Sequence, residues 1–413
     1  MNMIRPFKGL RPSSDKASEV ASPPYDVMSY QEATLLAKDR ANSFLHISRP
    51  EIDLPEGTDP YSSEVYEKAS ENLKKLIDNN VLSREEVPCF YIYRLTGHGV
   101  CQSGLVVTAS VDAYDQNLIR KHEFTRPVKE DDRVCQIDQL RAQTGPVLLA
   151  YPSSKDIDDI IASETLSAPE QHVTASDGVQ HEIWTLSCQE KIATLVALFD
   201  DLPALYIADG HHRSAAASRV QKLMRGRAED VSAGTESYDY FLAVAFPQDQ
   251  MKILAYNRVI TDLNGLNSKA FLERLRDEFD IQCSDEPVVP ETKGVMGAYF
   301  DGCWYTLTLR EKTKSTDPVD SLDVSALSNR VLGPILGIND LRKDKRIDFV
   351  GGIRGTQELV RRVDSGAMAC AFSLYPTRIE ELMSVADGGQ VMPPKSTWFE
   401  PKLADGLISH VLD

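Results

Sequence analysis

Apolar and polar positions in the first third of the chain predict two helices and one pair of strands. Ser29 and Glu32 have the spacing of a capping box, so a short helix is expected directly after them. A longer helix is expected over residues 61–79, which are rich in Ala, Leu, Glu and Lys. Residues 89–111 instead hold aromatic and β-branched runs on either side of a glycine-rich turn, a pattern that predicts a β-hairpin.

The rest of the chain alternates short apolar runs with helical stretches. Strands are expected at residues 147–150, 183–186, 204–207, 241–246, 253–256 and 369–374, and around Phe349. Helices are expected near Asp156 and Lys191, and over residues 212–225, 270–279, 322–332, 357–363 and 379–385. This alternation is typical of a protein that mixes helices and strands.

The succession of elements predicts a mixed α/β (α+β) fold with more than one domain. A length of 413 residues suits two or three domains of ordinary size. We expect a central core over residues 88–260, an N-terminal segment over residues 1–87 that packs on this core, and a C-terminal α/β domain over residues 261–413.

Charge and composition narrow the class of partner. The formal net charge of -17 opposes the polyanionic backbone of nucleic acids, so nucleic acid is not the expected partner. No stretch approaches the roughly 20 apolar residues that cross a bilayer, and the opening residues are too polar for a signal peptide. The seven cysteines lie far apart without a C-x-x-C pair, which indicates reduced thiols. We therefore expect a cytoplasmic protein without a membrane partner.

The segment from Asp209 to Arg213 joins a predicted strand to a predicted helix and carries the strongest chemical signal. The first turn of a helix has unpaired N–H groups and a partial positive charge, which acidic side chains usually complement. Here His211 and His212 are basic instead. Such a helix end receives phosphate well, because Gly210 permits close approach of the backbone and Arg213 offers two parallel donors. Asp209 is then a candidate to ligate Mg²⁺ or to orient a hydroxyl group.

A structural interpretation of the same segment stays open. In it, Asp209 caps the helix and the two histidines fill space near a domain interface. The sequence has no P-loop, Rossmann, zincin or α/β-hydrolase motif that offers another chemistry.

A second charged segment, residues 119–133, follows another strand-like run. Its most informative member is Glu123, which stands among basic residues. A carboxylate set among Arg120, Lys121 and Arg126 stays ionised at neutral pH, and can accept a proton from a substrate hydroxyl that faces a phosphate donor. A solvated surface of salt bridges is the open alternative.

Near the C-terminus, residues 392–402 join a diproline to Lys395, Ser396, Thr397 and two aromatic side chains. An ammonium group and two hydroxyls on a rigid turn can contact a phosphate. A packing brace built on the two aromatic rings is the alternative.

The run Asp209-Gly210-His211-His212-Arg213, followed by Ser and three alanines, resembles the phosphate-binding motif of the ParB/sulfiredoxin superfamily, most closely its form in free-serine kinases. Those kinases place a His-Glu pair upstream, and His122-Glu123 matches it in order and type. The resemblance implies that the motif grips nucleotide phosphates, that Glu123 is the general base, and that Asp209 helps to place metal or substrate. Sulfiredoxin chemistry is not expected, because its turn needs a cysteine.

Over its whole length the chain resembles a large uncharacterised bacterial and archaeal family often labelled ParB-like or SpoOJ-like. The matching stretches are residues 5–12, 23–26, 49–55, 121–133, 209–213, 347–355 and 392–402. Long segments on both sides of the central core distinguish the chain from the serine kinases, and these additions bear on the identity of the phosphate acceptor.

These patterns predict a phosphotransferase that uses ATP or ADP with Mg²⁺ to phosphorylate a small hydroxylated metabolite, with free L-serine as the preferred acceptor. The expected catalytic residues are Glu123, Asp209 and His212, with Asp209 as the metal ligand. The expected phosphate contacts are Gly210, His211, His212, Arg213 and Ser214. The expected acceptor contacts are Lys121, His122 and Arg126.

Two other classes of function stay open. The core can act as a nucleotide-dependent switch that binds CTP or ATP and drives dimerisation or partner binding, as ParB partition proteins do, although no DNA-binding helix-turn-helix is evident. It can also be a scaffold that has kept the fold and lost turnover. Homodimerisation, the choice of nucleotide and the direction of transfer are not fixed by the sequence.

Overall fold

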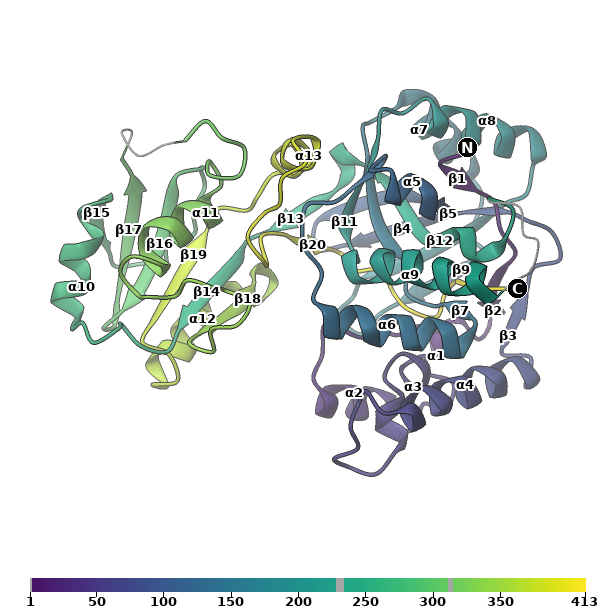
Figure 1. Cartoon of the computed structure of the whole chain (residues 1–413), viewed down its shortest axis with the longest axis horizontal. Helices are drawn as coiled ribbons and strands as arrows, with labels where there is room; N and C mark the ends of the chain where they lie inside the picture. The colour runs from purple at the N-terminus through teal and green to yellow at the C-terminus, as the bar shows by residue number, and fades with distance from the viewer. Residues whose placement is uncertain (1, 228–233, 311–314) are drawn as a thin grey trace. The chain divides into compact units, whose positions relative to one another are not determined.

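Helices and strands alternate along the chain in a computed structural model that describes residues 2–227, 234–310 and 315–413 (Figure 1). The expected mixed α/β class is therefore confirmed. The chain divides into two compact units: unit 1 is Met1–Lys121, Thr125–Met251 and Pro401–Asp413, and unit 2 is His122–Phe124 and Lys252–Glu400. No helix in the described ranges is long and apolar enough to cross a membrane.

The two compact units are not the same objects as the three expected domains. A compact unit is defined by its internal contacts, whereas a domain is defined by its ability to fold alone. The expected boundaries after residues 87 and 260 therefore stay a prediction.

Unit 1 is built on a nine-stranded sheet in the order β6-β11-β8-β12-β5-β4-β10-β9, with β1 paired to β5 off this path. The strands are β1 Ile4–Arg5, β4 Phe90–Gly97, β5 Val100–Ser110, β6 Ile119–Arg120, β8 Val147–Tyr151, β9 Gln171–Thr174, β10 Gln180–Leu186, β11 Leu205–Asp209 and β12 Tyr240–Pro247. The hairpin predicted for residues 89–111 is confirmed as β4 and β5, whose turn places His98 and Gly99 at positive φ. The strands predicted at 147–150, 183–186, 204–207 and 241–246 are confirmed as well.

Helices cover this sheet with small and branched apolar side chains. They are α5 Val111–Asp115, α7 Lys155–Glu164, α8 Gln189–Asp200 and α9 His211–Arg227, and α6 Pro127–Leu140 packs on α9. Helix α9 buries Ala215 and Ala217 in the core of the sheet, and Ala216 and Val220 against α6. Alanines let the helix approach the sheet closely, so α9 is held between the sheet and α6.

A second layer of unit 1 comes from both ends of the chain. Its helices are α1 Ala17–Val20, α2 Tyr30–Ala37, α3 Leu45–Ser48, the 3-10 helix η1 Pro50–Asp53, and α4 Ser63–Asp78. Its sheet has the order β3-β2-β21-β7, with β2 Gly9–Pro12, β3 Leu82–Arg84, β7 Ala142–Gln143 and β21 Ser409–Val411. The capping box at Ser29 and Glu32 is confirmed at the start of α2, and the helix predicted over residues 61–79 is confirmed as α4. The C-terminal tail is therefore an integral part of unit 1.

Unit 2 contains a six-stranded antiparallel sheet in the order β15-β17-β16-β19-β14-β18 and a separate pair, β13 and β20. The strands are β13 Lys252–Leu254, β14 Tyr256–Ile260, β15 Phe279–Ser284, β16 Val295–Phe300, β17 Cys303–Leu309, β18 Ile347–Gly351, β19 Cys370–Leu374 and β20 Trp398–Glu400. The helices include α10 Ser268–Leu275, α11 Asp323–Leu327, α12 Gly355–Asp364 and α13 Ile379–Asp387.

Unit 2 also corrects three predicted boundaries. The helix expected over residues 270–279 ends at Leu275, and Phe279 begins β15 instead. The strand expected at 253–256 is broken at Ala255 into β13 and β14. The helix expected over 322–332 is α11 followed by a π-helix, Ser328–Leu332.

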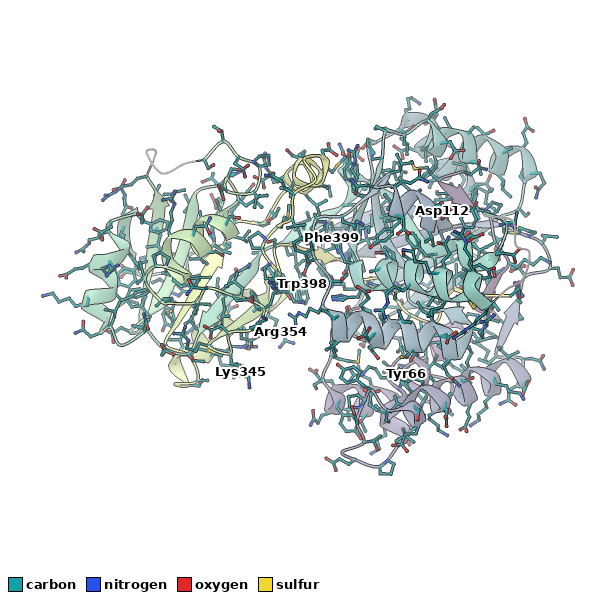
Figure 2. The ribbon with its side chains drawn as sticks, viewed as in Figure 1. Tyr66, Asp112, Lys345, Arg354, Trp398 and Phe399 are labelled. Atoms are coloured by element: carbon teal, nitrogen blue, oxygen red, sulfur yellow. The ribbon has the colours of Figure 1, made fainter. Side chains whose placement is uncertain are left out.

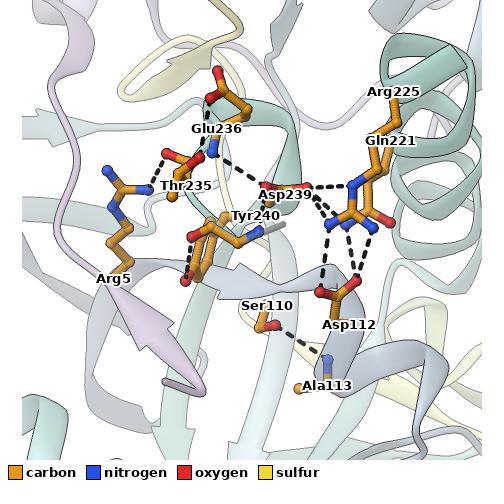
Figure 3. A network of polar contacts seen from close by, with 11 residues as sticks. Arg5, Ser110, Asp112, Ala113, Gln221, Arg225, Thr235, Glu236, Asp239 and Tyr240 are labelled. Carbon is orange, nitrogen blue, oxygen red and sulfur yellow. Dashed lines mark hydrogen bonds and ion pairs between the residues drawn. The ribbon is translucent and has the colours of Figure 1, made fainter. Parts of the chain in front are cut away.

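The second half of α9 is anchored by a buried carboxylate (Figure 3). Asp239 is 1% exposed and accepts hydrogen bonds from Gln221 at 3.0 Å and from Arg225 Nε at 3.0 Å. Both side chains also reach Asp112 on α5, at 3.1 Å and 3.4 Å. These contacts fix α9 along and around its axis, and thereby fix the position of its first turn.

Candidate active site

Residues 209–213, called the Asp209 turn below, lie where β11 passes into α9. The pairing of β11 with β8 shifts register between Ile207 and Asp209, and such a bulge re-aims the last side chain of the strand. Gly210 has a φ of +99°, a conformation that glycine adopts at little cost. Its carbonyl accepts hydrogen bonds from the backbone N–H groups of Arg213 at 2.9 Å and Ser214 at 3.0 Å, which starts the helix.

Helices α6 and α9 lie side by side and run in the same direction (Figure 1). At their first turns the backbone N–H of Arg126 donates to Nε2 of His212 at 3.0 Å, and further along Arg227 pairs with Asp138 at 2.6 Å. Such matching pairs at both ends require parallel helices. The positive ends of the two helix dipoles therefore meet beside the Asp209 turn, which favours an anion there.

Asp209 lies between two cations of unit 1. Its Oδ2 is 3.1 Å from Nζ of Lys402, and its Oδ1 is 3.9 Å from the guanidinium of Arg213. Burial alone would raise the pKa of Asp209, but the charges of Lys402 and Arg213 outweigh it and hold the pKa well below its usual value. The side chain is 36% exposed, so an ionised carboxylate is accessible at the turn.

Arg213 points into the protein. The sequence predicted instead that its guanidinium faces phosphate. A Cβ on Gly210 would lie 3.0 Å from Nε of Arg213, so the guanidinium folds back against the turn. It donates to the carbonyl of Pro146 and is only 13% exposed. Burial would lower the pKa of Arg213, but the charge of Asp209 and other neighbouring acids raises it. Its predicted contact with phosphate stays a prediction.

Residues that the sequence analysis missed complete the surroundings of Arg213. Asp405 in the C-terminal tail forms a backbone bridge with Ser22, and its carboxylate accepts a hydrogen bond from the backbone N–H of Tyr25. Burial raises the pKa of Asp405 to about 7, although the charges of Arg213 and Arg133 oppose the rise. Arg133 also lies 4.0 Å from the ring centroid of Tyr25. Both ends of the chain thus meet behind the Asp209 turn.

Three other residues that the sequence predicts to contact phosphate or acceptor lie in unit 1: His211, Ser214 and Lys121. His211 is buried in the first turn of α9. The hydroxyl of Ser214 is buried and donates to the carbonyl of His211 at 3.1 Å, so the side chain turns away from solvent. Nζ of Lys121 lies 4.2 Å from the ring centroid of Tyr114, a cation–π contact.

His122 and Glu123 belong to unit 2. His122 is buried, and its carbonyl accepts a hydrogen bond from the backbone N–H of Met392 at 2.8 Å. Glu123 lines a cavity of about 850 Å³ within unit 2. The polar side chains that line the same cavity are Ser328, Asn329, Asn339, Asp340 and Arg342. Glu123 thus stands in a cavity with several hydrogen-bonding groups.

The segment around Lys395 is a tight turn of unit 2. The hydroxyl of Ser396 is buried and donates to the carbonyl of Pro393 at 2.5 Å, and Thr397 is half-buried. Buried Arg258 donates to the carbonyl of Lys395 at 3.0 Å. These bonds tie the turn to its own unit.

The two aromatic side chains after this turn, Trp398 and Phe399, lie on β20 (Figure 2). A Cβ on Gly351 would lie 2.8 Å from the ring of Trp398, and the ring centroid of Tyr256 is 5.1 Å away. Phe399 is buried. The two aromatic side chains therefore brace the sheet of unit 2, and the phosphate contacts of Lys395, Ser396 and Thr397 stay a prediction.

The family of the chain can be stated from its sequence. A family model described as Protein of unknown function (DUF1015) matches residues 4–325, well over half of the chain. The chain belongs to the DUF1015 family. The DUF1015 match includes the Asp209 turn and the His122-Glu123 pair. No curated protein matches the sequence.

Solved structures of other proteins are similar to this DUF1015 chain at low identity. A free serine kinase in complex with AMP is 14% identical with a TM-score of 0.34, over 71% of this chain and 86% of its own. SbnI with a C-terminal truncation, from Staphylococcus aureus, is 11% identical with a TM-score of 0.38, over 72% and 84%. A conserved hypothetical protein from Pyrococcus furiosus is 14% identical with a TM-score of 0.34, over 73% and 93%. Scores of this size leave the chemistry to be inferred from the residues of the site.

Proposed function

We propose that the protein is a phosphotransferase that binds nucleotide phosphates at the Asp209 turn and passes one phosphoryl group to the hydroxyl of a small metabolite. The observation that carries this proposal is the meeting of the parallel starts of α6 and α9 at a glycine turn. Two positive helix ends favour a polyanion there. The resemblance of Asp209–Arg213 to the motif of free-serine kinases, within the ParB/sulfiredoxin superfamily, supports the same assignment.

Asp209 fits the role of a Mg²⁺ ligand. Its carboxylate is ionised, accessible and at the edge of the turn. Mg²⁺ commonly takes one or two protein carboxylates and completes its octahedral shell with phosphate oxygens and water. When bound, the ion supplies positive charge that neutralises the transferring phosphoryl group.

The roles of the other residues of the turn follow from their positions. His211, His212 and the backbone at the start of α9 hold the phosphates in this proposal. Nε2 of His212 accepts a hydrogen bond, so that this nitrogen carries no proton while the bond is made. Arg213 stabilises the turn from inside, and direct contact with phosphate requires it to leave the carbonyl of Pro146.

The acceptor is proposed to bind at Glu123, which takes the proton of its hydroxyl group as general base. The cavity at Glu123 has room for free L-serine, the preferred acceptor, and for larger hydroxylated metabolites. Lys121, His122 and Arg126 are proposed to contribute to binding of the acceptor carboxylate.

The test is phosphate transfer by the full-length protein with Mg²⁺, with ATP, ADP and CTP each offered against L-serine. We expect O-phosphoserine, and a loss of rate of about 100-fold or more in Glu123→Gln, the range typical of a lost general base. Lys155→Gln is the matched control, because Lys155 is an exposed residue of α7 paired with Asp159. Tight nucleotide binding without any phosphorylated product would sink the proposal and favour the nucleotide-dependent switch.

A further inference from the structure

The C-terminal tail brings a further cation, Lys402, to the Asp209 turn. Lys402 pairs with Asp209 through one carboxylate oxygen, and Arg213 approaches the other. A divalent cation that arrives alone must compete with the Lys402 ammonium for the Asp209 carboxylate, so it should bind weakly.

Lys402 is the cation of the two that can move. Arg213 is buried and held by the Pro146 carbonyl, whereas the side chain of Lys402 is 22% exposed. The backbone beside it is fixed, since the N–H of Ala404 donates to the hydroxyl of Tyr93 at 3.1 Å. A flexible four-carbon stem on a fixed backbone lets the ammonium group change partner while the tail stays in place.

We propose that Lys402 binds a nucleotide phosphate and, by moving from Asp209 to that phosphate, uncovers the Asp209 carboxylate for Mg²⁺. The inference rests on the proposed function, because it assumes that nucleotide phosphates bind at the Asp209 turn. Lys402 then has two effects: it strengthens the binding of nucleotide without metal, and it weakens the binding of metal without nucleotide. The site therefore takes up its metal together with the nucleotide.

Two binding measurements on the full-length protein test this inference. Calorimetric titration with ADP in the presence of EDTA measures nucleotide binding without metal, and electron paramagnetic resonance of Mn²⁺ measures metal binding without nucleotide. In Lys402→Met we expect ADP affinity in EDTA to fall about 10- to 100-fold, as for a lost charged hydrogen bond, and Mn²⁺ affinity to rise about 10-fold. Lys402→Arg should keep most of the ADP affinity, and Lys155→Met is the matched control.

A second variant keeps the test decisive if Lys402→Met does not fold. Asp209→Asn releases Lys402 from its ion pair, so its ADP affinity in EDTA should equal or exceed that of the wild type. A lower ADP affinity in EDTA for this variant contradicts the inference.

The outcomes separate this inference from the proposed function. If wild type binds ADP with Mg²⁺ but Lys402→Met matches it in both measurements, the role of Lys402 is wrong and the proposed function stands. If wild type binds neither ATP nor ADP, with or without Mg²⁺, both are wrong.

Discussion

Gly210 is the residue on which the shape of the candidate site depends most directly. Its positive φ turns the chain from β11 into α9, and its missing side chain leaves room for the guanidinium of Arg213. Both conditions are local, which is why the sequence could place the turn. Asp209 and the two histidines owe their positions to this one residue.

Replacing Gly210 by Ala is expected to lower the free energy of unfolding by about 1–3 kcal/mol, because an L side chain at this φ is strained and meets Arg213. Nucleotide affinity should fall as well. Gly226→Ala near the end of α9 is the control: its Cβ meets nothing within 4 Å, so it should be neutral or stabilise by about 0.5–1 kcal/mol. Urea unfolding measures both variants, and equal effects would contradict the role of the turn.

Asp405 should make stability depend on pH. Its pKa is about 7 in the folded protein against 3.8 as an ordinary side chain, so its contribution is complete below about pH 4 and is lost as the pH rises to 7. The difference between these two pKa values corresponds to at most about 4 kcal/mol in the free energy of unfolding. Compared with Asp405→Asn, wild type should therefore lose stability between pH 4 and 8 in urea unfolding. Parallel pH profiles would show that Asp405 is ionised throughout.

The sequence could identify Asp209 to Arg213, but not the residues that surround them. Lys402 lies 193 positions from Asp209 in the chain, and nothing in the local pattern of the tail indicates the ion pair. Tyr25 and Asp405 likewise meet only because the chain ends fold together. The inward direction of Arg213 depends on these partners, so it too could not be predicted from the sequence.

At the scale of elements, the parallel pair of α6 and α9 is what turns a local motif into a site. Hydrophobic patterning predicted α9 because its alanines and its glycine turn are local signals. The direction of α6 relative to α9 depends on tertiary packing of Val134 and Ile137, which no pattern within one helix reveals. The same limit explains why the helix expected up to residue 279 ended too late. Phe279 continues the helical pattern of the sequence, but in the structure it pairs with β17 as the first residue of β15.

The anchor of α9 should be costly to remove. Arg225→Ala takes away a charged partner of buried Asp239, which keeps Gln221 as a donor, so we expect a loss of about 1–3 kcal/mol in the free energy of unfolding. Arg219→Ala on the same helix removes exposed pairs with Glu130 and Asp131 and should cost less than about 1 kcal/mol. Similar losses in thermal or urea unfolding would mean that the network does not anchor the helix.

At the scale of the whole molecule, net charge bears on the class of partner, and chain topology determines which residues reach the Asp209 turn. The charge of -17 counts against a DNA-binding switch of ParB type, because DNA binding depends on releasing counterions with basic side chains. The return of the tail to unit 1, which brings Lys402 and Asp405 to the turn, is a property of the fold and not of any local motif.

A labelled DNA duplex should therefore show no change in fluorescence anisotropy at physiological salt up to about 10 µM protein, with or without CTP. Binding that weakens steeply as salt is added would contradict this expectation. It would revive the switch as the function of the chain.

The most direct test of phosphoryl transfer is the phosphorus NMR spectrum of one sample that contains the protein, Mg²⁺, L-serine and either ATP or ADP. We predict that the terminal phosphate resonance of the nucleotide declines while the resonance of O-phosphoserine grows, and that Glu123→Gln abolishes the change. Nucleotide resonances that broaden on binding but are never accompanied by O-phosphoserine would contradict transfer, even if the nucleotide binds at the Asp209 turn.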